Sequence, residues 1–80
     1  MQFAVITRDE KFIDVAQYSP NERFQEQYLK EFAENYIDYN EDEMIDIEYH
    51  EGGEITITDN NIIISGDNGM IQFDWFYRSV

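Results

Sequence analysis

The carboxylates between Tyr39 and Glu54 are the side chains of this sequence with the most chemical potential. The stretch "YNEDEMIDIEYHEGGE" contains seven acidic residues and neither lysine nor arginine. Carboxylates at this density can bind a cation, act as paired acids in catalysis, or attract a basic partner. Each of these roles needs different neighbouring residues.

Catalysis is the role that the neighbouring residue types support least. The chain has one histidine, His50, no cysteine, and three serines, of which Ser19 is placed to cap a helix. His50 is expected to be an ordinary strand residue beside Glu48 and Glu51. Paired carboxylates also need a cleft that gives the two acids different environments, and 80 residues leave little room for one. We therefore expect no enzymatic activity and no catalytic residue.

A calcium loop is the next alternative, because "DYNEDEMIDIEY" begins like an EF-hand with Asp38, Asn40 and Asp42. The sixth position, however, is Glu43 where glycine is needed, and the twelfth is Tyr49 where glutamate is needed. No glycine-rich phosphate loop is present either. We expect no metal site and no cofactor, and a weak surface cation site is the alternative that these acids leave open.

The charge distribution favours a basic partner. The formal net charge is −13, yet residues 1–30 are nearly balanced, and thirteen acids lie between Lys30 and Arg78 with no lysine or arginine among them. Direct binding to nucleic-acid phosphates needs the opposite sign, and an anionic membrane surface is disfavoured for the same reason. No signal peptide, membrane span or cysteine framework is apparent, so we expect a cytoplasmic protein.

The expected elements are those of one small domain, residues 1–80. Residues 2–7 and 12–18 read as strands, and a capping box at Ser19 and Glu22 predicts a helix from Pro20 to Ile37. The helix carries an apolar stripe of Phe24, Tyr28, Phe32 and Tyr36. Residues 43–49, 54–59, 61–65 and 70–77 read as further strands.

These elements predict an α+β fold, with an antiparallel sheet of about five to six strands and one amphipathic helix on one face, in ββαββββ order. Turns at Asn60-Asn61 and Asn68-Gly69 would place Ile57 opposite Ile64 and Ile64 opposite Phe73, and a Gly-Gly-Glu turn would place Tyr49 opposite Ile57. One sheet face is then apolar. Ile63 and Phe76 fall on the other face, where a homodimer contact is one interpretation.

Solubility is the simplest explanation of the acidic stretch, but three observations favour a binding role. The net charge exceeds the magnitude of about 2 to 8 that keeps a small domain soluble. Like charges at Glu31, Glu34 and Asp38 destabilise the end of a helix. Carboxylates about 5–7 Å apart on a helix or strand are also spaced on the scale of neighbouring phosphates.

In size, lack of cysteine, net charge and the acidic stretch from Glu31 to Glu54, the chain resembles the small acidic phage proteins that mimic nucleic acid, the anti-CRISPR and anti-restriction inhibitors. The segment "NYIDY" (35–39) is also similar to an acidic stretch near the end of some anti-restriction proteins. The resemblance implies competitive blocking of a DNA- or RNA-binding groove in the host cytoplasm, and it assigns no residue a role.

The expected partner is a basic nucleic-acid-binding protein or complex, a CRISPR effector or a restriction enzyme. An immunity- or antitoxin-type inhibitor of one basic toxin is the first alternative. A non-catalytic acidic interaction domain is the second. The residues expected to contact the partner are Glu34, Asp38, Tyr39, Glu41, Asp42, Glu43, Asp46, Glu48 and Glu51.

Overall fold

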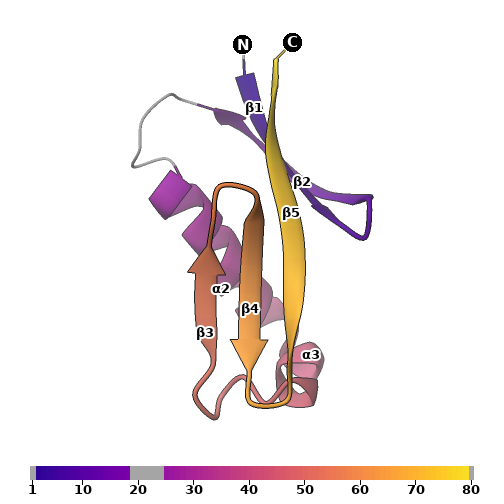
Figure 1. Ribbon diagram of the computed structural model, residues 1–80, viewed down its shortest axis with the longest axis vertical. Helices are drawn as coiled ribbons and strands as arrows, with labels where there is room; N and C mark the ends of the chain where they lie inside the picture. The colour runs from indigo at the N-terminus through magenta and orange to yellow at the C-terminus, as the bar shows by residue number, and fades with distance from the viewer. Residues whose placement is uncertain (1, 19–24, 80) are drawn as a thin grey trace.

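A computed structural model describes residues 2–18 and 25–79 and confirms the α+β prediction (Figure 1). Five antiparallel strands form one sheet in the order β2-β1-β5-β4-β3. The strands are β1 (Gln2–Arg8), β2 (Lys11–Tyr18), β3 (Glu54–Ile57), β4 (Asn61–Gly66) and β5 (Gly69–Ser79). The helical elements are a π-helical turn η1 (Gln25–Leu29), α2 (Lys30–Tyr39) and the short α3 (Glu41–Asp46).

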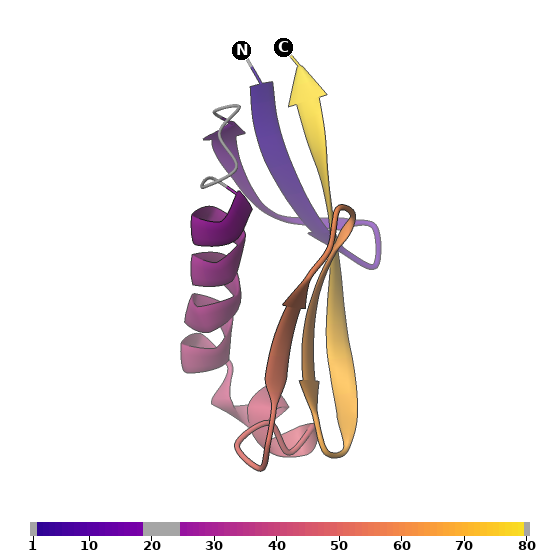
Figure 2. The same cartoon turned by 60° about the vertical axis from the view of Figure 1, so that its left-hand side comes forward.

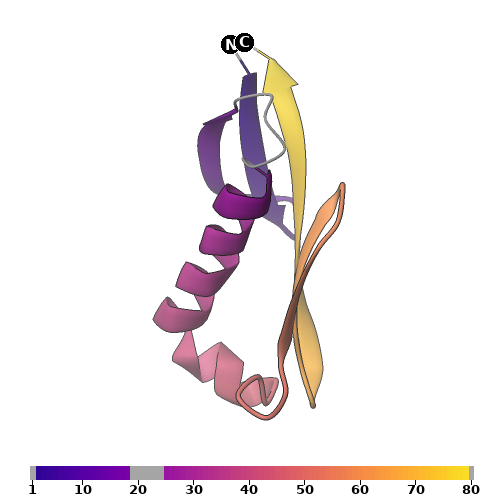
Figure 3. The same ribbon diagram turned by 90° about the vertical axis from the view of Figure 1, so that its left-hand side faces the viewer.

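Strand β5 connects the two halves of the sheet. Its first half pairs with β4, from Gly69 to Asp74, and its second half pairs with β1, from Asp74 to Ser79. The hairpins β1–β2 and β3–β4 therefore lie toward opposite ends of one long strand. Helix α2 runs along one face of the twisted sheet, and α3 lies at the end where β4 turns into β5 (Figures 1, 2 and 3).

The core lies between α2 and the sheet. Leu29, Ala33 and Ile37 recur every four residues on the buried side of the helix. The ring of Phe73 on β5 meets Phe32 and Tyr36 edge-on, with centroids 5.1 and 4.9 Å apart. The aromatic stripe predicted for the helix therefore flanks the core rather than filling it. Phe24 and the predicted cap at Ser19 lie outside the described residues.

The prediction of a strand over residues 43–49 is wrong, because this segment forms α3 and a following turn. Met44 and Ile47, three residues apart, are buried, whereas Ile45 is 61 % exposed. Acidic residues fill the first turn of α3, where they complement the positive end of the helix dipole. The helical spacing of Met44 and Ile47 and the acidic first turn therefore outweigh the alternation of Ile45, Ile47 and Tyr49, which favours a strand.

Both predicted hairpin registers are shifted by two residues. Asp59-Asn60 and Asp67-Asn68 form the turns, so Ile57 pairs with Ile62 and Ile64 pairs with Ile71. The predicted pairings of Ile57 with Ile64, of Ile64 with Phe73 and of Tyr49 with Ile57 are therefore wrong. A shift of two residues keeps every side chain on its predicted face, which is why the apolar face was assigned correctly.

Candidate acidic interaction surface

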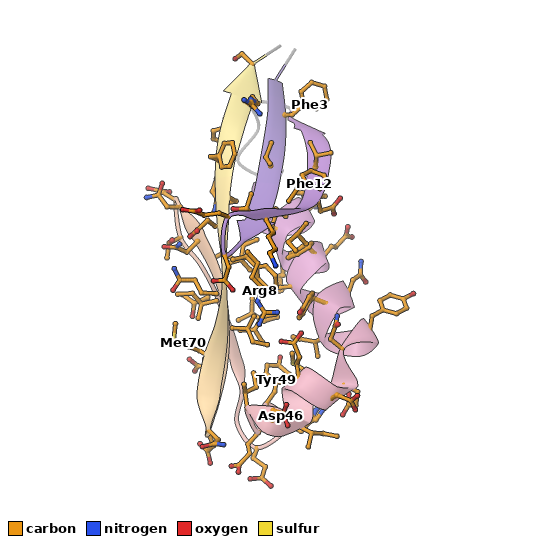
Figure 4. The ribbon with its side chains drawn as sticks, turned by 90° about the vertical axis from the view of Figure 1, so that its right-hand side faces the viewer. Phe3, Arg8, Phe12, Asp46, Tyr49 and Met70 are labelled. Carbon is orange, nitrogen blue, oxygen red and sulfur yellow. The ribbon has the colours of Figure 1, made fainter. Side chains whose placement is uncertain are left out.

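Exposed carboxylates from four segments gather at one end of the molecule, which we call the acidic pole. They come from α3, the turn after it, the first residue of β3 and the β4–β5 turn (Figure 1). Asp46 marks this end in Figure 4. None of these segments contributes a lysine or arginine. The members of the acidic pole are Glu41, Asp42, Asp46, Glu48, Glu51, Glu54 and Asp67, all exposed.

Backbone contacts between two turns hold the pole together. The backbone N–H of Asn68 donates a hydrogen bond to the carbonyl of Ile47 at 3.0 Å, and Nδ2 of the Asn68 side chain donates to the carbonyl of Asp46 at 3.2 Å. Gly66 allows the two turns to approach this closely. A Cβ at this position would clash with the Ile47 carbonyl oxygen and would lie 2.8 Å from the Tyr49 backbone nitrogen. The acidic turn is therefore fixed against the sheet.

This docking brings the carboxylates of Glu48, Glu51 and Asp67 within 4.8 Å of one another. All three are exposed, and Glu48 lies in the left-handed region with φ 57°. One oxygen from each carboxylate makes three converging ligands, fewer than the roughly six to eight oxygens that calcium takes. We assign no metal to the cluster, and its main physical effect is a local concentration of negative charge.

The acidic surface continues from the pole along the solvent side of α2. Glu31, Glu34 and Asp38 are exposed on the side opposite the buried stripe of the helix. With a rise of 1.5 Å per residue, Glu31 and Asp38 are about 10 Å apart along the axis. Pole and helix together form a row of carboxylates that extends over the long side of the molecule.

Glu43 differs from its acidic neighbours because its charge is paired within the fold. Its carboxylate lies 3.0 Å from Nη1 of Arg8 and also accepts a hydrogen bond from the Tyr36 hydroxyl. The same Arg8 nitrogen donates to the Tyr36 oxygen at 2.7 Å, and Arg8 extends toward these groups from β1 (Figure 4). Glu43 is only partly exposed, so it contributes less to the outward field than Glu41 or Asp42.

The pKa values of this network reflect its geometry. Burial lowers the pKa of Arg8, but the hydrogen bond to Glu43 and the charge interactions with Tyr36, Glu43 and Asp9 together outweigh burial and raise it. Partial burial, together with the hydrogen bond to Glu43, raises the pKa of Tyr36 to about 12. Arg8 thus stays charged and Tyr36 stays neutral at physiological pH, which keeps the pair with Glu43 intact.

A groove of about 300 Å³ beside α2 combines aromatic rings with carboxylates. Tyr28, Phe32 and Tyr36 line it together with Asp14 from β2 and Glu31. Aromatic faces beside acids suit a guanidinium or ammonium group. The Tyr28 hydroxyl, from η1, donates to the Asp14 carboxylate on β2 at 3.0 Å. The sequence alone does not bring these two residues to the groove, because they meet only when the helical segment packs on the sheet.

Tyr39, also at this groove, is 86 % exposed and forms the last residue of α2. This exposure leaves the ring accessible to a partner. His50, in contrast, is a turn residue rather than the strand residue expected, and its Nε2 lies 2.7 Å from the Glu41 carboxylate. Both partners of that pair are more than half exposed, so a basic group from outside can reach Glu41.

The structure places the nine predicted contact residues on three consecutive segments. Glu34, Asp38 and Tyr39 lie on α2. Glu41, Asp42, Glu43 and Asp46 lie on α3. Glu48 and Glu51 lie in the next turn. Eight of them are exposed, and Glu43 is the exception. Asp67 joins the acidic pole from a distant part of the sequence, and only the docking of the two turns reveals it.

No protein-family model matches the chain, and comparisons with curated proteins and with solved structures give no significant match. Within residues 2–18 and 25–79, no helix has the length and apolar character needed to cross a bilayer.

Proposed function

We propose that this protein is a non-catalytic inhibitor that occupies the nucleic-acid-binding groove of a basic protein in the host cytoplasm. The observation that carries the proposal is the acidic pole, where seven exposed carboxylates from four segments meet without a lysine or arginine among them. Such a field attracts a cationic surface and accelerates its approach.

The proposed mechanism is competition for the partner's cations. Carboxylates of the pole and of the α2 row take the places of phosphates on lysine and arginine side chains, and carboxylates pair with guanidinium groups through charge-assisted hydrogen bonds. Tyr39 and the aromatic groove receive one cationic side chain at the edge of this contact. Shape and ring contacts supply selectivity that charge alone lacks.

The class of target follows from the charge and from the resemblance to phage inhibitors. A protein that binds DNA or RNA through its phosphates presents a groove of lysine and arginine, which is the complement of the acidic pole. CRISPR effector complexes and restriction enzymes have such grooves, and they are the proposed partners. A single basic toxin presents a similar charge on a smaller surface and is the alternative that the experiment must separate.

The test is displacement of labelled duplex DNA from purified effector and restriction complexes. We expect the protein to release the DNA from one of them, with an apparent affinity that falls steeply as salt is raised. Excess duplex should in turn release the protein from that complex. Binding to a complex without any loss of bound DNA contradicts the mimic. Tight binding to a small basic toxin that duplex DNA does not reverse supports the alternative inhibitor.

A further inference from the structure

The sheet face opposite α2 carries an apolar patch where β2, β1 and β5 lie side by side. Val5 on β1 pairs directly with Val15 on β2 and with Phe76 on β5, so the three side chains form one row across the strands. Phe3 and Phe12 extend the patch on the same face, and both are labelled in Figure 4. We call these five residues the outer patch.

Three of the five side chains in the outer patch are exposed to solvent, and Phe3 and Val5 are partly buried. Phe12 is 65 % exposed, and Val15 and Phe76 are each 44 % exposed. With about 150–250 Å² per aromatic side chain, the two phenylalanines alone leave on the order of 200 Å² of ring surface in water. With Val15 and the partly buried Phe3 and Val5 added, the patch approaches about 300 Å², the size of the largest apolar patch on many monomers, and such patches are often functional.

Charges on β5 flank the patch in a self-complementary order. Asp74, Phe76 and Arg78 follow one another at alternate positions, so all three project from the outer face. Asp74 and Arg78 are therefore each about 7 Å from Phe76, on opposite sides of it. Arg78 has no ion pair with any residue in the described ranges, and only one oxygen of Asp74 is used, by Asn61 at 2.8 Å.

Consider two copies packed face to face through their outer patches, related by a two-fold axis that runs between the sheets, perpendicular to β5, at Phe76. This symmetry makes the charges on the two copies of β5 complementary. It places Asp74 of one copy opposite Arg78 of the other, twice, and stacks the two outer patches between them. Sheets packed face to face lie about 10 Å apart, a distance that an aspartate and an arginine can bridge together. An axis along the strand would instead place each charge opposite its own copy and oppose association.

The same arrangement also separates the acidic poles. The pole lies near Gly69, at the start of β5, which is about 24 Å from Phe76 along the strand. Antiparallel stacking at Phe76 directs the two poles in opposite directions, about 48 Å apart by the same spacing. Because charges are screened over about 8 Å at physiological ionic strength, mutual repulsion between the poles does not prevent contact.

We infer that the outer patch binds a second copy of this chain, giving a two-fold dimer in which Phe76 lies at the axis and Asp74 pairs with Arg78 of the partner subunit. This inference does not depend on the proposed function. The apolar centre is small beside the roughly 800 Å² per partner of a standard interface, so the dimer is weak and concentration-dependent.

Sedimentation equilibrium over a wide concentration range tests the dimer. We expect the mass to rise toward twice the chain mass of 9.6 kDa, and Phe76→Ser to weaken association at least about tenfold. Met70→Ser is the matched control, since Met70 is 54 % exposed on the same face of β5 but outside the patch. Thermal unfolding followed by circular dichroism confirms that each variant is folded.

A charge swap tests the orientation. Asp74→Arg and Arg78→Asp should each weaken the dimer, and the double variant should restore it, because only the antiparallel arrangement pairs these positions reciprocally. A double variant no better than the singles overturns that arrangement. A chain that stays monomeric at every concentration overturns the dimer. Equal loss of association in Phe76→Ser and Met70→Ser overturns its placement on the outer patch.

Discussion

Arg8 and Glu43 are 35 positions apart in the sequence, and their side chains meet at 3.0 Å between β1 and α3. The guanidinium also lies over the ring of Phe73, 5.8 Å from its centroid. One cation from the nearly neutral N-terminal hairpin thus anchors the first turn of α3 to the sheet. Glu43 therefore stabilises the fold, whereas its acidic neighbours on α3 face solvent.

Replacing Glu43 by Gln should lower the free energy of unfolding by about 1 kcal/mol, the upper range for a partly exposed ion pair. The variant removes the charge opposite Arg8 and weakens the bond from Tyr36. Asp42→Asn makes the same charge change in the same first turn of α3 but leaves the Arg8 pair intact, so it should lower stability less than Glu43→Gln. Urea denaturation measures both. A shift of the same sign and size in the two variants would show that the Arg8 pair contributes nothing.

Stability should fall between pH 10 and pH 12 because of Tyr36. Its pKa is about 12 in the folded protein and about 10 in an unfolded chain, so in this interval the unfolded state has lost a proton that the folded state keeps. Because the unfolded state then binds fewer protons than the folded state, the free energy of unfolding decreases as pH rises. Tyr36→Phe should flatten that slope in urea titrations at each pH. An unchanged slope in the variant would place the pH dependence elsewhere.

Two substitutions in α3 distinguish the observed helix from the predicted strand. Met44→Ala should cost about 2–5 kcal/mol, since Met44 is fully buried against the core. Ile45→Ala should stay within about 0.5 kcal/mol, because Ile45 is 61 % exposed. A strand over 43–49 gives the opposite order, with Ile45 facing the core. The measured ranking of the two variants by urea denaturation decides between them.

The error at α3 has a physical origin that sequence patterns do not resolve. In "EMIDIEY", an apolar residue at every second position competes with the helical pair Met44 and Ile47. Burial in the folded protein decides between helix and strand for this segment. Which side chains are buried depends in turn on the position of Asn40, where α2 ends. The inner and outer faces of the sheet were predictable, because a register shift of two residues leaves each side chain on the same face. The registers themselves were not predictable, because they depend on which of two overlapping residue pairs forms each hairpin turn.

The candidate site was predictable in composition but not in its three-dimensional arrangement. Exposure of Glu41, Asp42 and Asp46 follows from charge alone, since unpaired acids are almost never buried. The ion pair of Glu43 with Arg8, and the arrival of Asp67 beside Glu48, depend on contacts between distant segments. The outer patch was also incompletely predicted, because Phe76 was recognised but the pairing of β5 with β1 was not.

The carboxylate cluster in the acidic pole should destabilise the fold at low ionic strength. Glu51→Gln removes one of three carboxylates that lie within 4.8 Å of one another, and we expect its melting midpoint to exceed that of the unmodified protein. The gain should disappear at high salt, because screening weakens repulsion between exposed charges. Glu10→Gln, in the β1–β2 turn, is the matched control and should give a smaller gain. A gain that persists in high salt would contradict an electrostatic origin.

Partner binding should depend on where the negative charge lies and not on its total. The combination Glu41→Gln, Asp42→Asn and Asp46→Asn removes three charges from the acidic pole and spares Glu43, whose charge stabilises the fold. We expect this variant to lose affinity for its target by at least about tenfold and to melt at a higher temperature. Each charge removed should also make the dependence of affinity on salt less steep.

The matched control removes three exposed charges away from the pole, with Asp9→Asn, Glu10→Gln and Asp59→Asn. Both triple variants change the net charge from −13 to −10, so only the position of the charge differs. The control should bind almost as well as the unmodified protein in DNA-displacement titrations. Equal losses in the two variants would mean that the target senses the overall field. Unchanged affinity in both, with higher melting temperatures, would mean that the acidic pole serves solubility and that the partner binds elsewhere.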